Sequence, residues 1–246
     1  MNSIPQDRLK AVLDGAARAA AAAGRNPAEI TLVGVSKFHP AEAVVEMAMA
    51  GLRDFGENRV QEAAGKKVEV VGRLGDLGVD AGMLRWHLVG HLQSNKAAKA
   101  AEIFDVIQTV DSVELVKRLG DAAGGLGKRV DCLVQVNTSG ETTKSGVELH
   151  QGIFLAEAIV AEPALRFKGL MTIGPLTDDM GLVREAFQLL RDLRDEMQRN
   201  QPAWGRLELS MGMTDDYPLA IACGATMIRI GTALFGSRRL NNQEGA

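Results

Sequence analysis

The chain has 246 residues, of which 46% are hydrophobic and 24% charged, and its formal net charge is only -3. This composition is typical of a soluble globular protein, and the near-balance of charge argues against nucleic acid as a partner. The N-terminal segment MNSIPQDRLK lacks the layout of a secretory signal, and no apolar run reaches membrane-spanning length. Two cysteines, Cys132 and Cys223, cannot build a disulfide framework in a chain of this size, so we expect a cytoplasmic protein.

Taken in chain order, helical patterns alternate with short β-branched runs, which is typical of a parallel sheet wrapped by helices. An Ala-rich helix is expected over residues 1–24, and strands are expected at 30–37, 53–58, 86–90, 104–110, 130–137, 166–174, 206–212 and 227–236. Helical patterns lie between them at 41–51, 112–124, 150–161, 182–199 and 216–225. The Gly-rich stretch from Lys66 to Arg85 has no clear period, and we expect a surface loop there.

Eight β/α units in roughly 200 residues predict an α/β fold of the TIM (β/α)8 barrel class, with an extra N-terminal helix. An open doubly wound sheet shares the same alternation and is the main alternative, but the count of eight favours a closed barrel. No stretch resembles an interdomain linker, so residues 1–246 are expected to form a single domain.

The active face of a TIM barrel lies at the carboxyl ends of its strands, and most of the predicted strands end there in polar residues. Lys37, which closes the first strand, is the strongest candidate, because desolvation at the barrel mouth favours the neutral amine that attacks carbonyl groups. The functional interpretation is a Schiff base with an aldehyde or ketone. The structural alternative is an ion pair with Glu57 or Glu208, and position alone does not separate the two.

The last strand ends in Gly231 and Thr232, where backbone amides at a strand-to-helix turn could cradle a phosphate. Ser210, at the end of the seventh strand, would add a hydroxyl to the same anion. Strand alternation places Arg229 on the same face as Gly231, so its guanidinium points inward and needs an acceptor. That acceptor is either a ligand atom or a carboxylate such as Glu208.

Metal binding and cysteine chemistry find little support. His87 and His91 are four residues apart on a predicted strand, which separates them by roughly 13 Å at about 3.3 Å per residue, too far for one zinc ion. The two cysteines show no metal-ligand spacing and give no sign of a nucleophile.

Six motifs follow one another over nearly the whole chain: VGVSK at 33–37, FGENRVQE at 55–62, WHLVGHLQSNK at 86–96, VNTSGETTKSGV at 136–147, GLMTIGP at 169–175 and LSMGMTDDYPLAIACGATMIRIGTALFGSR at 209–238. Together they resemble the pyridoxal 5'-phosphate (PLP) homeostasis proteins. This family consists of single-domain PLP binders that are related in fold to the N-terminal barrel of bacterial alanine racemase.

The resemblance implies that Lys37 carries PLP as a Schiff base and that Ser210, Gly231 and Thr232 hold its phosphate. It implies that Arg229 meets the pyridine nitrogen, and that the ring or its substituents have as neighbours Asn58, His87 and Met211. Lys144 also matches the family and would be a nearby positive charge. The sequence departs from many relatives at Phe38 and His39, where they have a small residue and a second lysine.

The resemblance implies a PLP carrier in intracellular vitamin B6 homeostasis, with PLP-dependent apoenzymes as partners and no catalysis of its own. A cation such as Arg229 beside the ring nitrogen weakens the cofactor as an electron sink, and the second, tyrosine-bearing domain of the racemases is not expected here. We interpret Tyr217 as a packing residue at the start of a helix, and we expect a monomer. The alternatives are a weak PLP-dependent amino-acid racemase and a Schiff-base aldolase.

Overall fold

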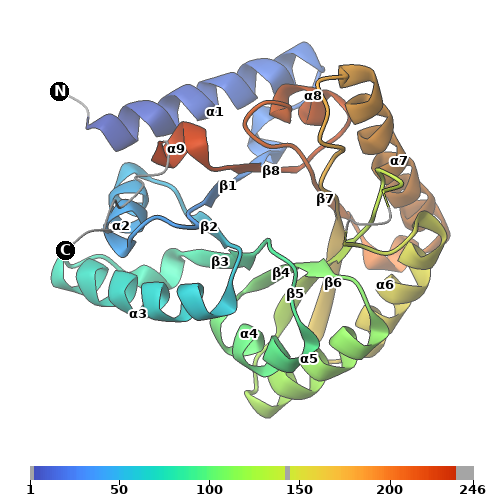
Figure 1. Ribbon diagram of the computed structural model, residues 1–246, viewed down its shortest axis with the longest axis horizontal. Coiled ribbons are helices and arrows are strands. Elements are labelled where there is room, and N and C mark those ends of the chain that lie inside the picture. The colour runs from blue at the N-terminus through green and yellow to red at the C-terminus, as the bar shows by residue number, and fades with distance from the viewer. Residues whose placement is uncertain (1–2, 142–144, 237–246) are drawn as a thin grey trace, which may run out of the picture.

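The computed structural model describes residues 3–141 and 145–236, and in it eight parallel strands close into a barrel in chain order, from β1 to β8. Closure is made by pairing of β1 with β8, with Leu32 opposite Ile228. Helices surround the strands, and α1 lies along the outside of the ring beside α8 and α9 (Figure 1). The closed ring confirms the TIM barrel and excludes the open doubly wound sheet.

The elements are as follows. The strands are β1 Thr31–Val35, β2 Asp54–Glu57, β3 Arg85–Leu88, β4 Val106–Val110, β5 Val130–Gln135, β6 Leu165–Met171, β7 Glu208–Ser210 and β8 Met227–Ile230. The α-helices are α1 Ile4–Ala22, α2 Ala41–Ala50, α3 Val60–Asp76, α4 Ala97–Ile103, α5 Val113–Gly125, α6 Gly152–Ala161, α7 Met180–Asn200, α8 Tyr217–Ala222 and α9 Thr232–Phe235. Short 3-10 helices occupy Pro27–Glu29, Ala81–Met83, Ser94–Lys96, Leu149–Gln151 and Pro202–Trp204.

The eight predicted strands and the leading helix are confirmed, but the predicted surface loop from Lys66 to Arg85 is wrong over its first half. Helix α3 continues to Asp76, and Val70 and Leu74 are buried one turn apart on its inner face. Its glycines lie on the exposed face, where each costs about 1 kcal/mol relative to alanine. That sum is smaller than the gain from burying the apolar face of the helix, so tertiary packing overrides the local propensity.

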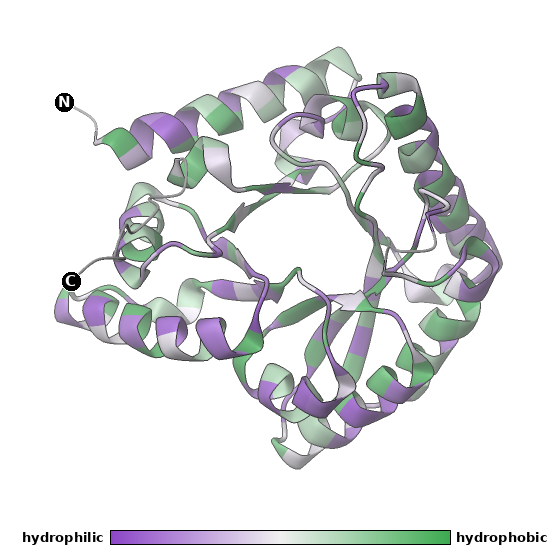
Figure 2. Ribbon diagram, in the orientation of Figure 1, coloured by the Kyte–Doolittle hydropathy of each residue, from purple (hydrophilic) through white to green (hydrophobic). Residues whose placement is uncertain are grey.

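Strand alternation divides the buried residues into two regions. We call the layer between strands and helices the mantle; Phe55, Trp86 and Phe104 belong to it, and it forms the large apolar core. The space enclosed by the strands is the lumen, where Val106, Leu133 and Met171 form a small separate apolar cluster. The surrounding helices carry hydrophilic and hydrophobic residues along their lengths (Figure 2), as expected where one face packs on the strands.

Among the described residues, no helix is both long and apolar enough to cross a membrane. Helix α8 begins at Tyr217, as predicted, and the tyrosine hydroxyl lies close against Gly15 of α1. A Cβ at Gly15 would come within 2.3 Å of that hydroxyl oxygen, so the glycine allows the leading helix to pack against α8. The expected packing role of Tyr217 therefore agrees with its place in the fold.

Candidate functional site

A cavity of about 410 Å³ opens at the carboxyl ends of the strands, where the active face of this fold lies. Its volume is within the range of about 300–1,000 Å³ that suits a cofactor-sized ligand. It is lined by residues of β1 and β8 and of the segments that follow β1, β2, β3, β6, β7 and β8: Val35, Lys37, Asn58, Val89, Ile173, Met213, Thr214, Asp215, Arg229, Gly231 and Thr232.

The fold brings five of the eight predicted site residues onto the wall of this one cavity, namely Lys37, Asn58, Arg229, Gly231 and Thr232. They come from positions almost 200 residues apart, and closure of β8 on β1 joins them. The other three, Ser210, His87 and Met211, are fully buried and do not belong to its lining. Ser210 lies directly behind Arg229, whereas His87 lies deeper in the lumen.

Side chains of β2 and α3 hold the backbone on both sides of Lys37. The Lys66 ammonium donates to the Ser36 carbonyl at 2.8 Å, and the Ser36 hydroxyl donates to Glu57 at 2.7 Å. On the other side, the Phe38 amide donates to Glu62 at 2.7 Å. Lys37 itself is half-buried in the turn after β1, so the surrounding contacts fix the position from which its side chain enters the cavity.

Glu57 was one of the two carboxylates considered as an ion-pair partner of Lys37, but its partner is Lys66, at 2.6 Å. Both groups are buried, and Oε2 of Glu57 has no hydrogen-bond partner in the described part of the chain. Burial raises the pKa of the Glu57 carboxyl, and the nearby Lys66 ammonium opposes this only in part. Lys37 is therefore not the residue that neutralises Glu57.

Phe38, directly after the lysine, adopts a left-handed backbone conformation with φ of 65°. It is the one residue other than glycine with positive φ among those described, and an aromatic side chain rarely adopts it. Its ring is half-exposed, and the Arg59 guanidinium lies 5.9 Å from the ring centroid. The Glu62 contact to the Phe38 amide holds this strained turn in place.

Arg229 is 4% exposed and lines the cavity. Its guanidinium donates to the Ser210 hydroxyl at 2.7 Å and to the Thr172 carbonyl at 2.8 Å. Burial lowers the pKa of Arg229 to about 10, which leaves the side chain protonated at neutral pH. In the described chain Arg229 forms no salt bridge, although the nearby Asp216 carboxylate opposes part of the lowering of its pKa.

The structural alternative for Arg229, pairing with Glu208, is not found. Glu208 begins β7 and lines a different cavity, of about 310 Å³, at the amino ends of the strands with Thr31 and Met227. Arg229 lies two residues further along β8 than Met227, toward the carboxyl ends. A buried cation that forms no salt bridge in the described chain therefore faces the carboxyl-end cavity.

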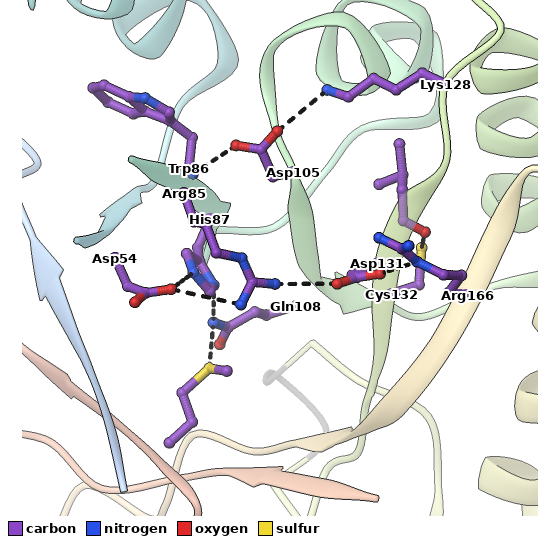
Figure 3. A network of polar contacts seen from close by, with 12 residues as sticks. Asp54, Arg85, Trp86, His87, Asp105, Gln108, Lys128, Asp131, Cys132 and Arg166 are labelled. Atoms are coloured by element: carbon purple, nitrogen blue, oxygen red, sulfur yellow. Dashed lines mark hydrogen bonds and ion pairs between the residues drawn. The ribbon is translucent and has the colours of Figure 1, made fainter. Parts of the chain in front are cut away.

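Polar residues continue behind the site into the lumen. The Ser210 hydroxyl donates to Gln108 at 2.7 Å, and the Gln108 amide nitrogen lies 2.9 Å from Nδ1 of His87. Nε2 of His87 lies 2.9 Å from an Asp54 carboxylate oxygen (Figure 3). Both ring nitrogens of His87 are thus engaged within the lumen, and its expected role beside a cofactor ring stays a prediction.

Sequence reasoning missed several residues of this region. Thr214 and Asp215 line the cavity from the loop after β7, and no sequence pattern pointed to their orientation. Lys66 is not identified from the sequence, because the Gly-rich stretch from Lys66 to Arg85 predicts a loop. Gln108 carried a usable signal, since it is a polar residue in the middle of the apolar run 104–110. Lys144 lies outside the described residues.

Metal and thiol chemistry gain no support from the geometry. The described part of the chain contains no group of three or more His, Cys, Asp or Glu residues placed to hold a metal ion. Cys132 and Cys223 are buried free cysteines, and burial raises the pKa of both thiols, which disfavours the reactive thiolate.

Comparison with known proteins agrees with this arrangement. Residues 9–239 match the model of the family described as "Alanine racemase, N-terminal domain". The pyridoxal phosphate homeostasis protein of Pseudomonas aeruginosa is 46% identical over 89% of this chain and 90% of its own length. The protein of the same name from Escherichia coli strain K12 is 41% identical over 97% of this chain and 98% of its own.

A solved structure of PipY from Synechococcus elongatus, with PLP bound, superposes with a TM-score of 0.73. It is 42% identical and covers 90% of this chain and 99% of that chain. High identity, nearly full coverage of both chains and the same barrel leave no major part of the described fold unaccounted for. The chain therefore belongs to the alanine racemase N-terminal domain family and, within it, to the pyridoxal phosphate homeostasis proteins.

Proposed function

We propose that this protein binds PLP as a Schiff base on Lys37 and serves intracellular PLP homeostasis as a carrier. The observation that carries the proposal is the single cavity whose wall holds Lys37 together with Arg229, Gly231 and Thr232. An amine that can condense with an aldehyde thus faces a buried cation and a strand-to-helix turn. The name shared by the relatives and the PLP bound to PipY support this assignment.

The residues fit the cofactor in two further respects. Arg229 forms no salt bridge in the described chain, and Asp216 acts on it only as a nearby charge, so an electron-rich ring nitrogen is a suitable acceptor. At Gly231, a Cβ would meet the Val35 carbonyl oxygen at 3.5 Å, an ordinary contact, and φ is -107°. Packing within the protein does not require glycine there, whereas close approach of a phosphate to the backbone would.

In this proposal Gly231 and Thr232 receive the phosphate, Arg229 faces the pyridine nitrogen, and Asn58 contacts the ring or its substituents. Ser210 is fully buried outside the cavity lining and donates to Gln108, so its expected contact with the phosphate stays a prediction. His87 and Met211, both fully buried, act on the ring from behind the cavity wall.

PLP supplies an aldehyde and a ring that can withdraw electrons when its nitrogen is protonated. Arg229 stays protonated at neutral pH, because its pKa is lowered only to about 10. A cation at that position disfavours a proton on the ring nitrogen and so weakens carbanion chemistry. We infer that the protein stores and passes on PLP, to PLP-dependent apoenzymes, as a monomer without turnover of its own.

The first experiment is the Lys37→Ala change, with Lys117→Ala on the exposed surface of α5 as the matched control. Protein loaded with PLP should show visible absorption that borohydride reduction fixes on Lys37, as located by mass spectrometry of peptides. Lys37→Ala should lose this band, and Lys117→Ala should keep it. A phosphopyridoxyl group on another lysine of the wild-type protein would refute the assignment.

The racemase alternative is tested separately. The PLP-loaded protein is mixed with L-alanine and other L-amino acids, and the D form is assayed by chiral chromatography. Turnover at rates on the order of 1 to 1,000 per second would show an enzyme of ordinary efficiency and refute the carrier proposal. We expect no D-amino acid above the rate given by free PLP.

A further inference from the structure

A file of hydrogen bonds crosses the lumen behind the candidate site. It runs from Arg229 on β8 to Ser210 on β7, then to Gln108 on β4, His87 on β3 and Asp54 on β2, with successive distances of 2.7, 2.7, 2.9 and 2.9 Å. Three of the five residues, Ser210, Gln108 and His87, are fully buried. The file thus connects the cation at the cavity wall to a carboxylate at the amino end of β2.

The donors in this file all point the same way. The Gln108 amide nitrogen contacts Nδ1 of His87 and, at 3.0 Å, the sulfur of Met227. A thioether sulfur can only accept, so the nitrogen of Gln108 faces Met227 and its oxygen receives the Ser210 proton. Nδ1 of His87 then accepts, and the ring hydrogen on Nε2 is donated to Asp54. Each group donates to the next, from Arg229 to Asp54.

We propose that His87 and Gln108 are positioning residues, which hold Ser210 and through it fix the orientation in which Arg229 faces the ring nitrogen of the cofactor. Asp54 completes the file by fixing the tautomer of His87. This inference rests on the proposed function for the identity of the ligand. The hydrogen bonds themselves do not depend on it.

The file affects Arg229 because the guanidinium has few hydrogen bonds to protein. In the described chain it donates to the Thr172 carbonyl and to the Ser210 hydroxyl, so these two contacts set the plane of the guanidinium. A serine hydroxyl rotates freely unless its proton has an acceptor, and Gln108 provides that acceptor. Removing Gln108 would free the hydroxyl and with it one edge of the guanidinium.

The end of the file at Asp54 is itself held in place. The Arg85 guanidinium lies 3.9 Å from the Asp54 carboxylate and 3.1 Å from Asp131, and Asp131 is 2.5 Å from Arg166 (Figure 3). These ion pairs lie at the amino ends of the strands. The carboxylate that orients His87 is therefore part of a charged cluster at the opposite end of the barrel from the cavity.

The main test is Gln108→Leu, which keeps the size of the side chain but removes its hydrogen bonds to Ser210, His87 and Met227. The variant loosens the hydrogen bond between Ser210 and the charged Arg229. We therefore expect the dissociation constant for PLP to rise about tenfold or more and the absorption maximum of bound PLP to shift. Gln198→Leu is the matched control, since Gln198 on α7 outside the barrel accepts from the Leu207 amide. It should leave both readouts unchanged.

Conservative variants keep the test decisive if Gln108→Leu folds poorly. His87→Gln can still accept from Gln108 and donate to Asp54, so it should keep the wild-type spectrum, whereas His87→Leu should resemble Gln108→Leu. Asp54→Asn retains an acceptor without the charge and should give an intermediate effect. A spectrum and a PLP dissociation constant within twofold of wild type in both His87→Leu and Gln108→Leu would overturn the proposal.

A readout without PLP separates this inference from the proposed function. In ¹⁵N NMR spectra of the PLP-free protein, His87 should show the tautomer with hydrogen on Nε2, and Gln108→Leu should move the Arg229 guanidinium signals. If borohydride fixes PLP on a lysine other than Lys37 but these shifts occur, the proposed function falls and the positioning file stands. If the Arg229 signals do not move, the positioning role of the file is refuted, whether or not the protein binds PLP.

Discussion

The mantle and the lumen of this barrel are both buried, yet they are built from opposite chemistry. The mantle is the large apolar core, with aromatic residues such as Phe55, Trp86 and Phe104. The lumen has a small apolar cluster, and beside it lie buried polar and charged groups, among them His87 and Gln108. Burial alone therefore does not identify the core, because one buried region supplies stability and the other supplies orientation to the site.

The comparison predicts that mantle substitutions lower stability without changing the site. Phe104→Ala should lower the free energy of unfolding by about 4 kcal/mol, because it removes a fully buried ring and leaves a cavity. Urea denaturation measures this loss, and titration with PLP below the transition should give the wild-type stoichiometry. If the free energy of unfolding falls by less than about 1 kcal/mol, neighbouring side chains fill the cavity. The mantle would then contribute less to stability than we propose.

Lys66 and Glu57 form a buried charged pair within the otherwise largely apolar mantle, and changing Lys66 tests whether this pair is essential. Lys66→Met should lower the free energy of unfolding by about 3 kcal/mol, because it leaves the buried Glu57 carboxylate without its cation. It should also loosen Ser36 next to Lys37 and weaken PLP binding. The double variant Lys66→Met with Glu57→Gln should recover part of the stability, and no recovery would contradict this explanation.

The pH dependence of stability sharpens the role of Glu57. Its pKa is raised in the folded state by burial, above the value of 4.5 of the free side chain, so the folded protein binds the proton more tightly. Stability from this group therefore increases as pH falls from the raised pKa toward 4.5. Relative to Glu57→Gln, the wild type should gain stability between pH 7 and pH 5 in urea denaturation. If the difference in the free energy of unfolding between the two proteins is the same at pH 7 and pH 5, the pKa of Glu57 is not raised by folding.

The smallest expected effect is at the strained turn beside Lys37. Phe38→Asn should raise the free energy of unfolding by about 0.5 kcal/mol, since relief of the left-handed conformation exceeds the loss of the Arg59 contact. Phe154→Asn, an exposed phenylalanine on α6, is the control and should give no gain. Thermal unfolding of both variants measures the difference. A loss of stability in Phe38→Asn would mean that the ring contributes more than the strain costs.

The sequence by itself determined the barrel and named candidate site residues, five of which line one cavity. Alternation of strand and helix patterns, counted to eight, predicted closure, and the position of each polar residue at a strand end predicted which side of the barrel it would occupy. For Arg229, strand parity alone placed the guanidinium inward. These features follow from local periodicity, which a sequence displays directly.

Only the tertiary structure decided the partners of those groups. Glu57 pairs with Lys66 rather than with Lys37, and Arg229 meets Ser210 and Thr172 rather than Glu208. Helix α3 forms despite its glycines because its apolar face is buried against the strands. Such outcomes depend on which side chains closure of the ring brings within about 3 Å of each other, and no local pattern encodes that distance.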